Sequence, residues 1–227
     1  MTWVLITGAS KGLGLALTMN LLAIREDLHI VGVSRSAPPD NVLQSNRFSF
    51  MQADLSEPKE VLEKFSEWVT TAVSGEGEIV FINNAGTINP IGFSASAAEE
   101  LIQSVNINFL SPLLIYHSLV NAFAKVFLVN ITSGAANNPI AGWEMYAATK
   151  SAMKMFCATT EASRPGSTHS IDPGVIDTQM QAQIRSSNDP SFARKDNFVK
   201  LSIEGGLQSP PQAAVRVLDE LSSLSIL

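Results

Sequence analysis

The fold is decided by a short stretch near the start of the chain, which reads Trp3-Val4-Leu5-Ile6-Thr7-Gly8-Ala9-Ser10-Lys11-Gly12-Leu13-Gly14. Residues 3–7 are an apolar run that predicts a buried strand, and from Leu13 onward apolar residues recur at the three- and four-residue intervals of a helix. Glycines between a strand and a helix let the backbone approach a pyrophosphate, and the helix N-terminus adds free N–H groups and partial positive charge. The alternative is a glycine-rich connection that binds nothing. We therefore expect a dinucleotide-binding unit.

Strands and helices alternate along the rest of the chain. Further strands are expected at residues 29–34, 48–55, 78–82, 126–131 and 168–172, with helices between them at 99–124 and 145–158 and another that Ser56 caps and Gly75 and Gly77 close. This alternation predicts an α/β fold, a doubly wound parallel β-sheet of Rossmann type with six to seven strands flanked by helices. We expect a single domain over residues 1–227, with ligands at the carboxyl ends of the strands.

The end of the second expected strand indicates which dinucleotide is preferred. A site for NAD usually has an acid there, but the chain reads Ser34-Arg35-Ser36. Lys11 in the glycine loop supplies a second cation, and Arg forms charge-assisted, often bidentate hydrogen bonds with phosphate. The pattern favours NADP(H), unless Arg35 is only a solvated surface residue.

Three residues form a candidate catalytic group. Tyr146 and Lys150 are four apart in a helical segment and so share one helix face, and Ser133 follows the strand at 126–131. A hydroxyl at a strand end beside a Tyr–Lys pair can be a catalytic triad, although many Tyr-x-x-x-Lys pairs are simply solvated. Asn108, in the helical segment 99–124, is a further candidate. The alternative is that it is an ordinary buried packing residue.

Charge and composition argue against several classes of partner and site. The 227 residues carry a net charge of −6, which argues against nucleic acid as a partner. The single cysteine, Cys157, fits a buried apolar position better than a reactive thiol, and the three histidines lack metal-ligand spacing. There is no basic leader and no apolar run approaching 18 residues, so we expect a cytoplasmic protein with no membrane partner and no metal.

Taken together, these motifs resemble those of the short-chain dehydrogenase/reductases, and most closely the sepiapterin reductase and bacterial benzil reductase group. The order is Thr7-Gly8-Ala9-Ser10-Lys11-Gly12-Leu13-Gly14, Asp54-Leu55, Asn83-Asn84-Ala85-Gly86, Asn108, Ser133, Tyr146-x-x-x-Lys150, and Pro173-Gly174 followed by Asp177-Thr178. The motifs span residues 3 to 178. Gly142-Trp143 and the run from Pro173 to Met180 are the cues for the narrower group.

The resemblance implies roles for the matching residues. Tyr146 would be the general acid, and Lys150 would bind the nicotinamide ribose and lower the pKa of the tyrosine. Ser133 would hold the substrate carbonyl, and Asn108 would anchor a water that relays protons to Lys150. With the glycine loop and its cations, the resemblance implies that the residues binding the cofactor are Gly8, Ser10, Lys11, Gly12, Leu13, Gly14, Ser34, Arg35, Asp54, Leu55, Asn83, Asn84, Ala85, Gly86, Tyr146, Lys150, Pro173, Gly174, Val175, Ile176 and Thr178.

We therefore expect an NADPH-dependent carbonyl reductase for a small ketone or diketone, assembled as a homodimer or homotetramer. Ser133, Trp143 and Tyr146 are expected to contact the substrate, together with loop 87–95 and a covering segment at 178–209. Candidates for an apolar lining are Phe93, Trp143, Met145, Met180 and Phe192. Alternatives are a pteridine reductase of sepiapterin type, disfavoured because the sequence ends at Leu227 without the acidic tail residue that anchors pterin, and a non-catalytic NADP-binding sensor.

Overall fold

The computed structural model describes residues 2–72 and 77–227, and its strands form one parallel sheet. The strand order is β3-β2-β1-β4-β5-β6, and every neighbouring pair is parallel. The strands are β1 (Thr2–Thr7), β2 (Leu28–Ser34), β3 (Phe48–Gln52), β4 (Glu78–Asn83), β5 (Lys125–Ile131) and β6 (Thr168–Ile171). The order reverses between β1 and β4, which opens a crevice at their carboxyl ends. The predicted doubly wound fold is confirmed, with six strands in the described residues.

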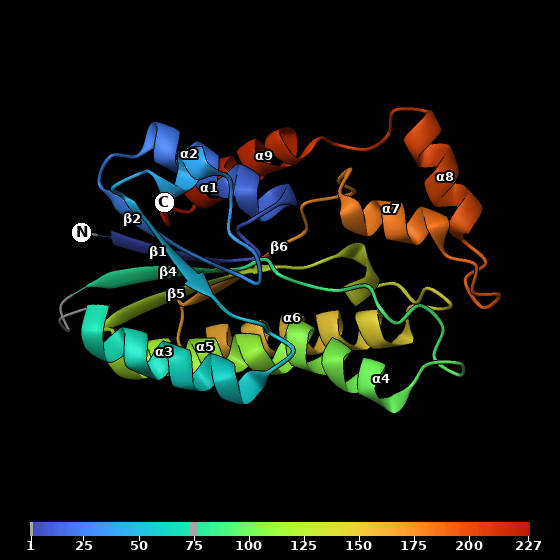
Figure 1. Ribbon diagram of the computed structural model, residues 1–227, viewed down its shortest axis with the longest axis horizontal. Helices are drawn as coiled ribbons and strands as arrows, with labels where there is room; N and C mark the ends of the chain where they lie inside the picture. Colours follow the sequence, from blue (N-terminus) through green and yellow to red (C-terminus); the bar gives the residue numbers. More distant parts are fainter. Residues whose placement is uncertain (1, 73–76) are drawn as a thin grey trace.

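Helices cover both faces of this sheet (Figure 1). One face carries α1 (Gly12–Ile24), α2 (Asp40–Leu43) and α9 (Pro210–Ser223), and the other carries α3 (Pro58–Ala72), α4 (Ala98–Val105), α5 (Ser111–Ala122) and α6 (Glu144–Ser163). Two further helices, α7 (Gln179–Ser186) and α8 (Lys195–Ile203), lie beyond the carboxyl ends of the strands. These two helices therefore lie apart from the two layers that cover the sheet.

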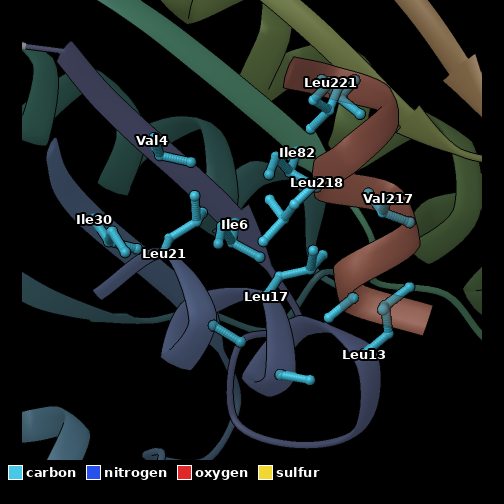
Figure 2. Packing of buried hydrophobic residues seen from close by; sticks show 14 of the residues in the cluster. Val4, Ile6, Leu13, Leu17, Leu21, Ile30, Ile82, Val217, Leu218 and Leu221 are labelled. Atoms are coloured by element: carbon cyan, nitrogen blue, oxygen red, sulfur yellow. The ribbon is translucent and has the colours of Figure 1, made fainter. Parts of the chain in front are cut away.

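Side chains along the central strands point alternately to the two faces of the sheet, and each face has its own hydrophobic core. Val4 and Ile6 of β1 face α1 and α9, whereas Leu5 between them packs into the cluster on the α3–α5–α6 side. Figure 2 shows the first of these cores, in which Leu17 and Leu21 of α1 lie between the sheet and α9. All five side chains are buried, so β1 is apolar on both faces, as parallel strands between two helical layers are.

Local structure corrects several sequence expectations. Ser56 does not cap α3, because the helix begins at Pro58 and the Ser56 hydroxyl donates to Asp54 Oδ1 at 2.9 Å. Gly75, expected to close that helix, lies outside the described residues. The segment 99–124, expected as one long helix or as two with little break, is two helices joined by a π-helical turn, Asn106–Leu110. The strand expected at 48–55 ends at Gln52, which leaves Asp54 and Leu55 in the loop at the sheet edge.

Candidate active site

A cavity of about 1220 Å³ runs along the carboxyl ends of the strands. One end is polar and is formed by the glycine loop and the ends of β2 and β3. The other end lies between the start of α6 and helices α7 and α8. Ser133, Tyr146 and Lys150 line the middle, so the cavity joins the residues that the sequence assigned to cofactor and to substrate.

The glycine loop is shaped by its lack of side chains. Gly8 and Gly12 have φ values of 72° and 56°, which L-residues rarely adopt, and both line the cavity. Gly14 does not line it. A Cβ on Gly14 would lie 2.3 Å from the carbonyl oxygen of Gly8, so this glycine allows α1 to pack against the loop. Asn84 Nδ2 donates to Thr7 O at 2.9 Å and ties the loop to the end of β4.

Two cations lie at the polar end, as expected. Lys11 and Arg35 both line the cavity, with Ser10, Ser34 and Ser36 beside them. The Ser36 hydroxyl donates to Ser10 Oγ at 3.2 Å, and Lys11 Nζ donates to Gln179 Oε1 at 2.5 Å. The latter bond links the glycine loop to the first turn of α7. The carboxylate of Asp54 also lines this end and accepts hydrogen bonds from Ser56, so it is held within its own turn.

Ser133, Tyr146 and Lys150 come together in the middle of the cavity. The hydroxyl of Ser133 lies close enough to that of Tyr146 to lower the pKa of the phenol, and Ser133 Oγ accepts from Ala135 N at 3.2 Å. Lys150 Nζ lies 5.9 Å from the centre of the Tyr146 ring and donates to Ile131 O at 2.9 Å. Tyr146 and Lys150 are 7% and 4% exposed. The one-face arrangement predicted from their spacing is confirmed, and the alternative of a solvated pair is excluded.

Burial dominates the electrostatics of this group. It raises the pKa of Tyr146, an effect that the hydrogen bond from Ser133 opposes and the carboxylate of Asp172 reinforces. Burial also lowers the pKa of Lys150 to about 8. Desolvation of the phenolate is the largest effect on the pKa of Tyr146, and the expectation that Lys150 lowers this pKa stays a prediction. The phenol stays protonated at neutral pH.

Asn108 lies in the π-helical turn, and its side chain is used for structure. Its Oδ1 accepts from Thr87 N at 2.8 Å, and its Nδ2 donates to Thr87 O at 2.9 Å and to Thr149 Oγ1 at 3.2 Å. A Cβ on Gly86 would lie 3.2 Å from Asn108 Oδ1 and 3.5 Å from Lys150 Nζ, so Gly86 lets these groups approach. The Asn108 side chain thus joins the π-helical turn to the loop at Thr87 and to helix α6 at Thr149, next to Lys150.

The substrate end is apolar and aromatic. Trp143 is 4% exposed, and its ring centre lies 5.7 Å from that of Tyr146, nearly perpendicular, and 5.2 Å from that of Phe198 in α8. Ile88 and Ile184 line the same end. The sequence identified Trp143 but missed Phe198, because nothing in the local pattern of α8 distinguishes an aromatic side chain that lines a cavity from one in a core.

Three of the apolar candidates are wrong as lining residues. Phe93 is 52% exposed and lies away from the cavity, as does Met145. Phe192 packs behind Trp143, with ring centres 5.5 Å apart, and Gly142 makes room for it, since a Cβ there would lie 3.0 Å from Phe192 Cβ. Met180 does line the cavity. Aromatic packing therefore holds the 178–209 segment in place.

The structure brings nearly all of the predicted cofactor residues to one cavity. Those that line it are Gly8, Ser10, Lys11, Gly12, Leu13, Ser34, Arg35, Asp54, Leu55, Asn84, Ala85, Gly86, Tyr146, Lys150, Pro173, Gly174, Val175, Ile176 and Thr178. Besides Gly14, the exception is Asn83, which is buried and donates to Asn130 Oδ1 at 3.2 Å. Asn83 therefore joins β4 to β5 within the sheet and does not line the cavity.

The covering segment and the loop at 87–95 contribute in part. From the segment 178–209, residues of α7 and the start of α8 line the cavity, whereas only Thr87, Ile88 and Asn89 of the loop do so. Among residues 2–72 and 77–227, no helix is long and apolar enough to cross a membrane, and no group of three or more metal-ligating side chains is placed to hold an ion.

Comparisons with known proteins agree with the fold. The profile of the short chain dehydrogenase family matches residues 2–189. Benzil reductase ((S)-benzoin forming) from Bacillus subtilis (strain 168) is 34% identical over 228 residues, which cover 96% of this chain and 92% of that protein. The Bacillus cereus benzil reductase is 32% identical, covering 98% and 95%. A sepiapterin reductase from Meriones unguiculatus is 30% identical over 65% of this chain and 59% of its own.

Among solved structures, that of the KRED1-Pglu enzyme superposes with a TM-score of 0.80. It is 26% identical in sequence, and the match covers 94% of this chain and 92% of that one. The likeness therefore extends over nearly the whole of both chains.

Proposed function

We propose, from the premise that this chain belongs to the short-chain dehydrogenase/reductase family, that it is an NADPH-dependent carbonyl reductase for small aromatic ketones and diketones. Members of the family are oxidoreductases that act on carbonyl and hydroxyl groups. The observation that carries the proposal is a buried Tyr146 beside Ser133 and Lys150, in a cavity with two cations at one end and an aromatic wall at the other.

The residues at the polar end fit a nicotinamide dinucleotide. Gly8 and Gly12 provide a loop whose backbone a pyrophosphate can approach, and α1 begins there with its free N–H groups. Lys11 and Arg35 suit a 2′-phosphate, and Thr178 and the backbone after Pro173 suit the carboxamide. When bound, the reduced nicotinamide supplies the hydride.

The chain's own groups supply the proton and hold the carbonyl. Tyr146, whose raised pKa keeps the phenol protonated at neutral pH, donates its proton to the carbonyl oxygen. Ser133 donates a hydrogen bond to the same oxygen and fixes its position. Lys150, charged below about pH 8, keeps a proton close to the tyrosine. Asn108 fixes the backbone at Thr87, beside Lys150.

The substrate class follows from the wall of the cavity. Trp143, Phe198, Ile88 and Ile184 offer apolar and aromatic surface to a ring next to the reacting carbonyl. Two relatives that cover more than nine-tenths of the chain are named benzil reductases, and benzil is a diaryl diketone. The proposal is that such diketones fit here, with one carbonyl on Ser133 and Tyr146.

NADPH oxidation against a panel of carbonyl compounds tests this function. The panel holds benzil, 1-phenyl-1,2-propanedione, a simple aryl ketone and sepiapterin, each with NADPH and with NADH. We expect the diketones to react fastest and NADPH to exceed NADH. Sepiapterin reduced faster than either diketone would favour a pteridine reductase, and tight NADPH binding without turnover of any carbonyl would favour a sensor.

We also propose that the protein is a homodimer or homotetramer. Ile102 of α4, Leu110 of the π-helical turn and Met155 of α6 are 58%, 38% and 67% exposed, on the helical layer that such enzymes use between subunits. Light scattering after size exclusion gives the mass directly. A monomer at micromolar concentration would contradict this part of the proposal.

A further inference from the structure

An acid that the sequence analysis passed over lies in the middle of the cavity. Asp172 follows β6 directly and precedes Pro173-Gly174, and it lines the cavity with Ser133 and Tyr146. Its Oδ1 accepts from Gly174 N at 2.9 Å, which fixes the side chain. A Cβ on Gly134 would lie 3.7 Å from its Oδ2, so this oxygen lies beside the turn that carries Ser133.

The charge of Asp172 is not paired. Within the described residues its carboxylate forms no ion pair, and the nearby Arg216 donates to the backbone oxygen of Asp172 instead. The other charged groups that line this part of the cavity are Lys150, on the same helix as the phenol, and Asp177, which pairs with Arg185 at 3.4 Å; Glu100 and Arg194 line the cavity farther along. An unpaired, solvent-accessible carboxylate thus lines the cavity beside Ser133 and Tyr146, the residues proposed to bind the reacting carbonyl.

We propose that Asp172 biases the site toward carbonyl reduction, because its negative charge stabilises the cationic, oxidised nicotinamide relative to the neutral, reduced one. This inference rests on the proposed function. In the reaction, a hydride carries two electrons from the reduced ring to the carbonyl carbon, and the carbonyl oxygen takes the proton of Tyr146. The ring gains a positive charge in that step, and a nearby carboxylate lowers its free energy.

A second consequence concerns the acid itself. The Asp172 carboxylate raises the pKa of Tyr146, because a phenolate beside it would be a second negative charge. Asp172 thereby favours the protonated phenol, which is the form present before reduction and again after it, once the tyrosine has regained a proton. Asp172 is a positioning residue in this account, since it acts on charge and does not transfer the proton or the hydride.

The test is binding of the two cofactor forms without any substrate. Dissociation constants for NADP⁺ and NADPH are measured by calorimetry for the wild type, Asp172→Asn, Asp172→Glu and Asp177→Asn. In Asp172→Asn we expect the ratio of the NADP⁺ to the NADPH constant to rise by about threefold to tenfold, as for unit charges several ångströms apart in a partly solvated site. Asp172→Glu should keep most of the wild-type ratio. Asp177 lines the same cavity, but its carboxylate pairs with Arg185 at 3.4 Å, so Asp177→Asn removes a charge that is already paired and should change the ratio much less.

An unchanged ratio in Asp172→Asn, with both forms still bound, would overturn the inference and leave the proposed function standing. Failure of the wild type to bind either form would overturn both. A second readout is the pH profile of alcohol oxidation, in which the deprotonated phenol is the base. Without the carboxylate the pKa of Tyr146 falls, so the rising limb should move to lower pH; a limb that stays in place would count against the inference.

Discussion

The two ends of the cavity are built in different ways. The polar end, proposed for the cofactor, rests mainly on backbone: the glycine loop after β1 and the segments that follow β2, β3 and β4, held in register by the sheet. The substrate end is made by side chains from α6, α7 and α8, which meet through Trp143, Phe192 and Phe198. The first depends on adjacent residues in one motif, and the second on aromatic packing between residues about fifty apart. A change at one end should therefore leave the other largely intact.

Tyr146→Phe should have the largest effect, because Tyr146 lies where the two ends meet. Removing the hydroxyl removes the acid without changing the ring that packs on Trp143. We expect turnover of a diketone to fall by about 10²–10⁴-fold, with NADPH affinity nearly unchanged. Steady-state kinetics and calorimetry measure the two quantities. Retained turnover would remove Tyr146 from the mechanism.

Gly14→Val tests the backbone end. A Cβ at this position would lie 2.3 Å from the carbonyl oxygen of Gly8, so the loop and α1 must separate. We expect a loss of about 1–3 kcal/mol in the free energy of unfolding and at least tenfold weaker NADPH binding. Chemical denaturation and calorimetry report these changes. Gly77→Ala is the control, since its Cβ would find only ordinary contacts, the nearest at 3.8 Å, and it should bind NADPH normally.

Arg35→Ala sharpens the assignment of the polar end. Loss of a charge-assisted hydrogen bond to a 2′-phosphate costs about 1.5–3 kcal/mol, so the preference for NADPH over NADH should drop by about 10- to 100-fold. The ratio of kcat/KM for the two cofactors is the measurement. Arg25→Ala removes a half-buried arginine that pairs with Asp27 and does not line the cavity, and it should leave the ratio unchanged. An Arg35→Ala variant with the wild-type ratio would leave Arg35 as a solvated surface residue.

Phe198→Ala tests the packed end. The ring lines the cavity and lies on Trp143, so its loss should raise KM for benzil by about tenfold while NADPH affinity stays within twofold of the wild type. A small aliphatic diketone, which does not reach α8, serves as the matched substrate and should be affected less. Equal losses for both substrates would show that α8 only supports the fold.

The smallest effect is expected from pH. Burial lowers the pKa of Lys150 from 10.5 to about 8, so its ammonium is present below that pH and is lost as pH rises through it. The pKa of Tyr146 is raised, so the phenol stays protonated over the same range. We expect kcat/KM for carbonyl reduction to decline by a few-fold above about pH 8. Lys154→Met, an exposed neighbour on α6, should keep the same profile; a rate that is flat through pH 9 would contradict the role of Lys150.

The same contrast explains what the sequence could predict. The strand–glycine–helix motif, the cations Lys11 and Arg35 and the Tyr146–Lys150 pair were found because short spacing determines their geometry. Phe198 and Asp172 were missed, since their places in the cavity depend on contacts between distant segments. The raised pKa of Tyr146 could not be predicted either, because burial, its dominant cause, is a property of the packed structure and not of the spacing to Lys150.

The most direct test of the whole account is a single turnover. Wild-type protein holding one equivalent of NADPH is mixed with excess benzil, and the nicotinamide absorbance and the benzoin formed are followed together. The account predicts that the absorbance of the reduced cofactor disappears and that one benzoin forms for each NADPH consumed. Bound NADPH whose absorbance persists in the presence of benzil would contradict the claim that the two ends of this cavity form one reductase site.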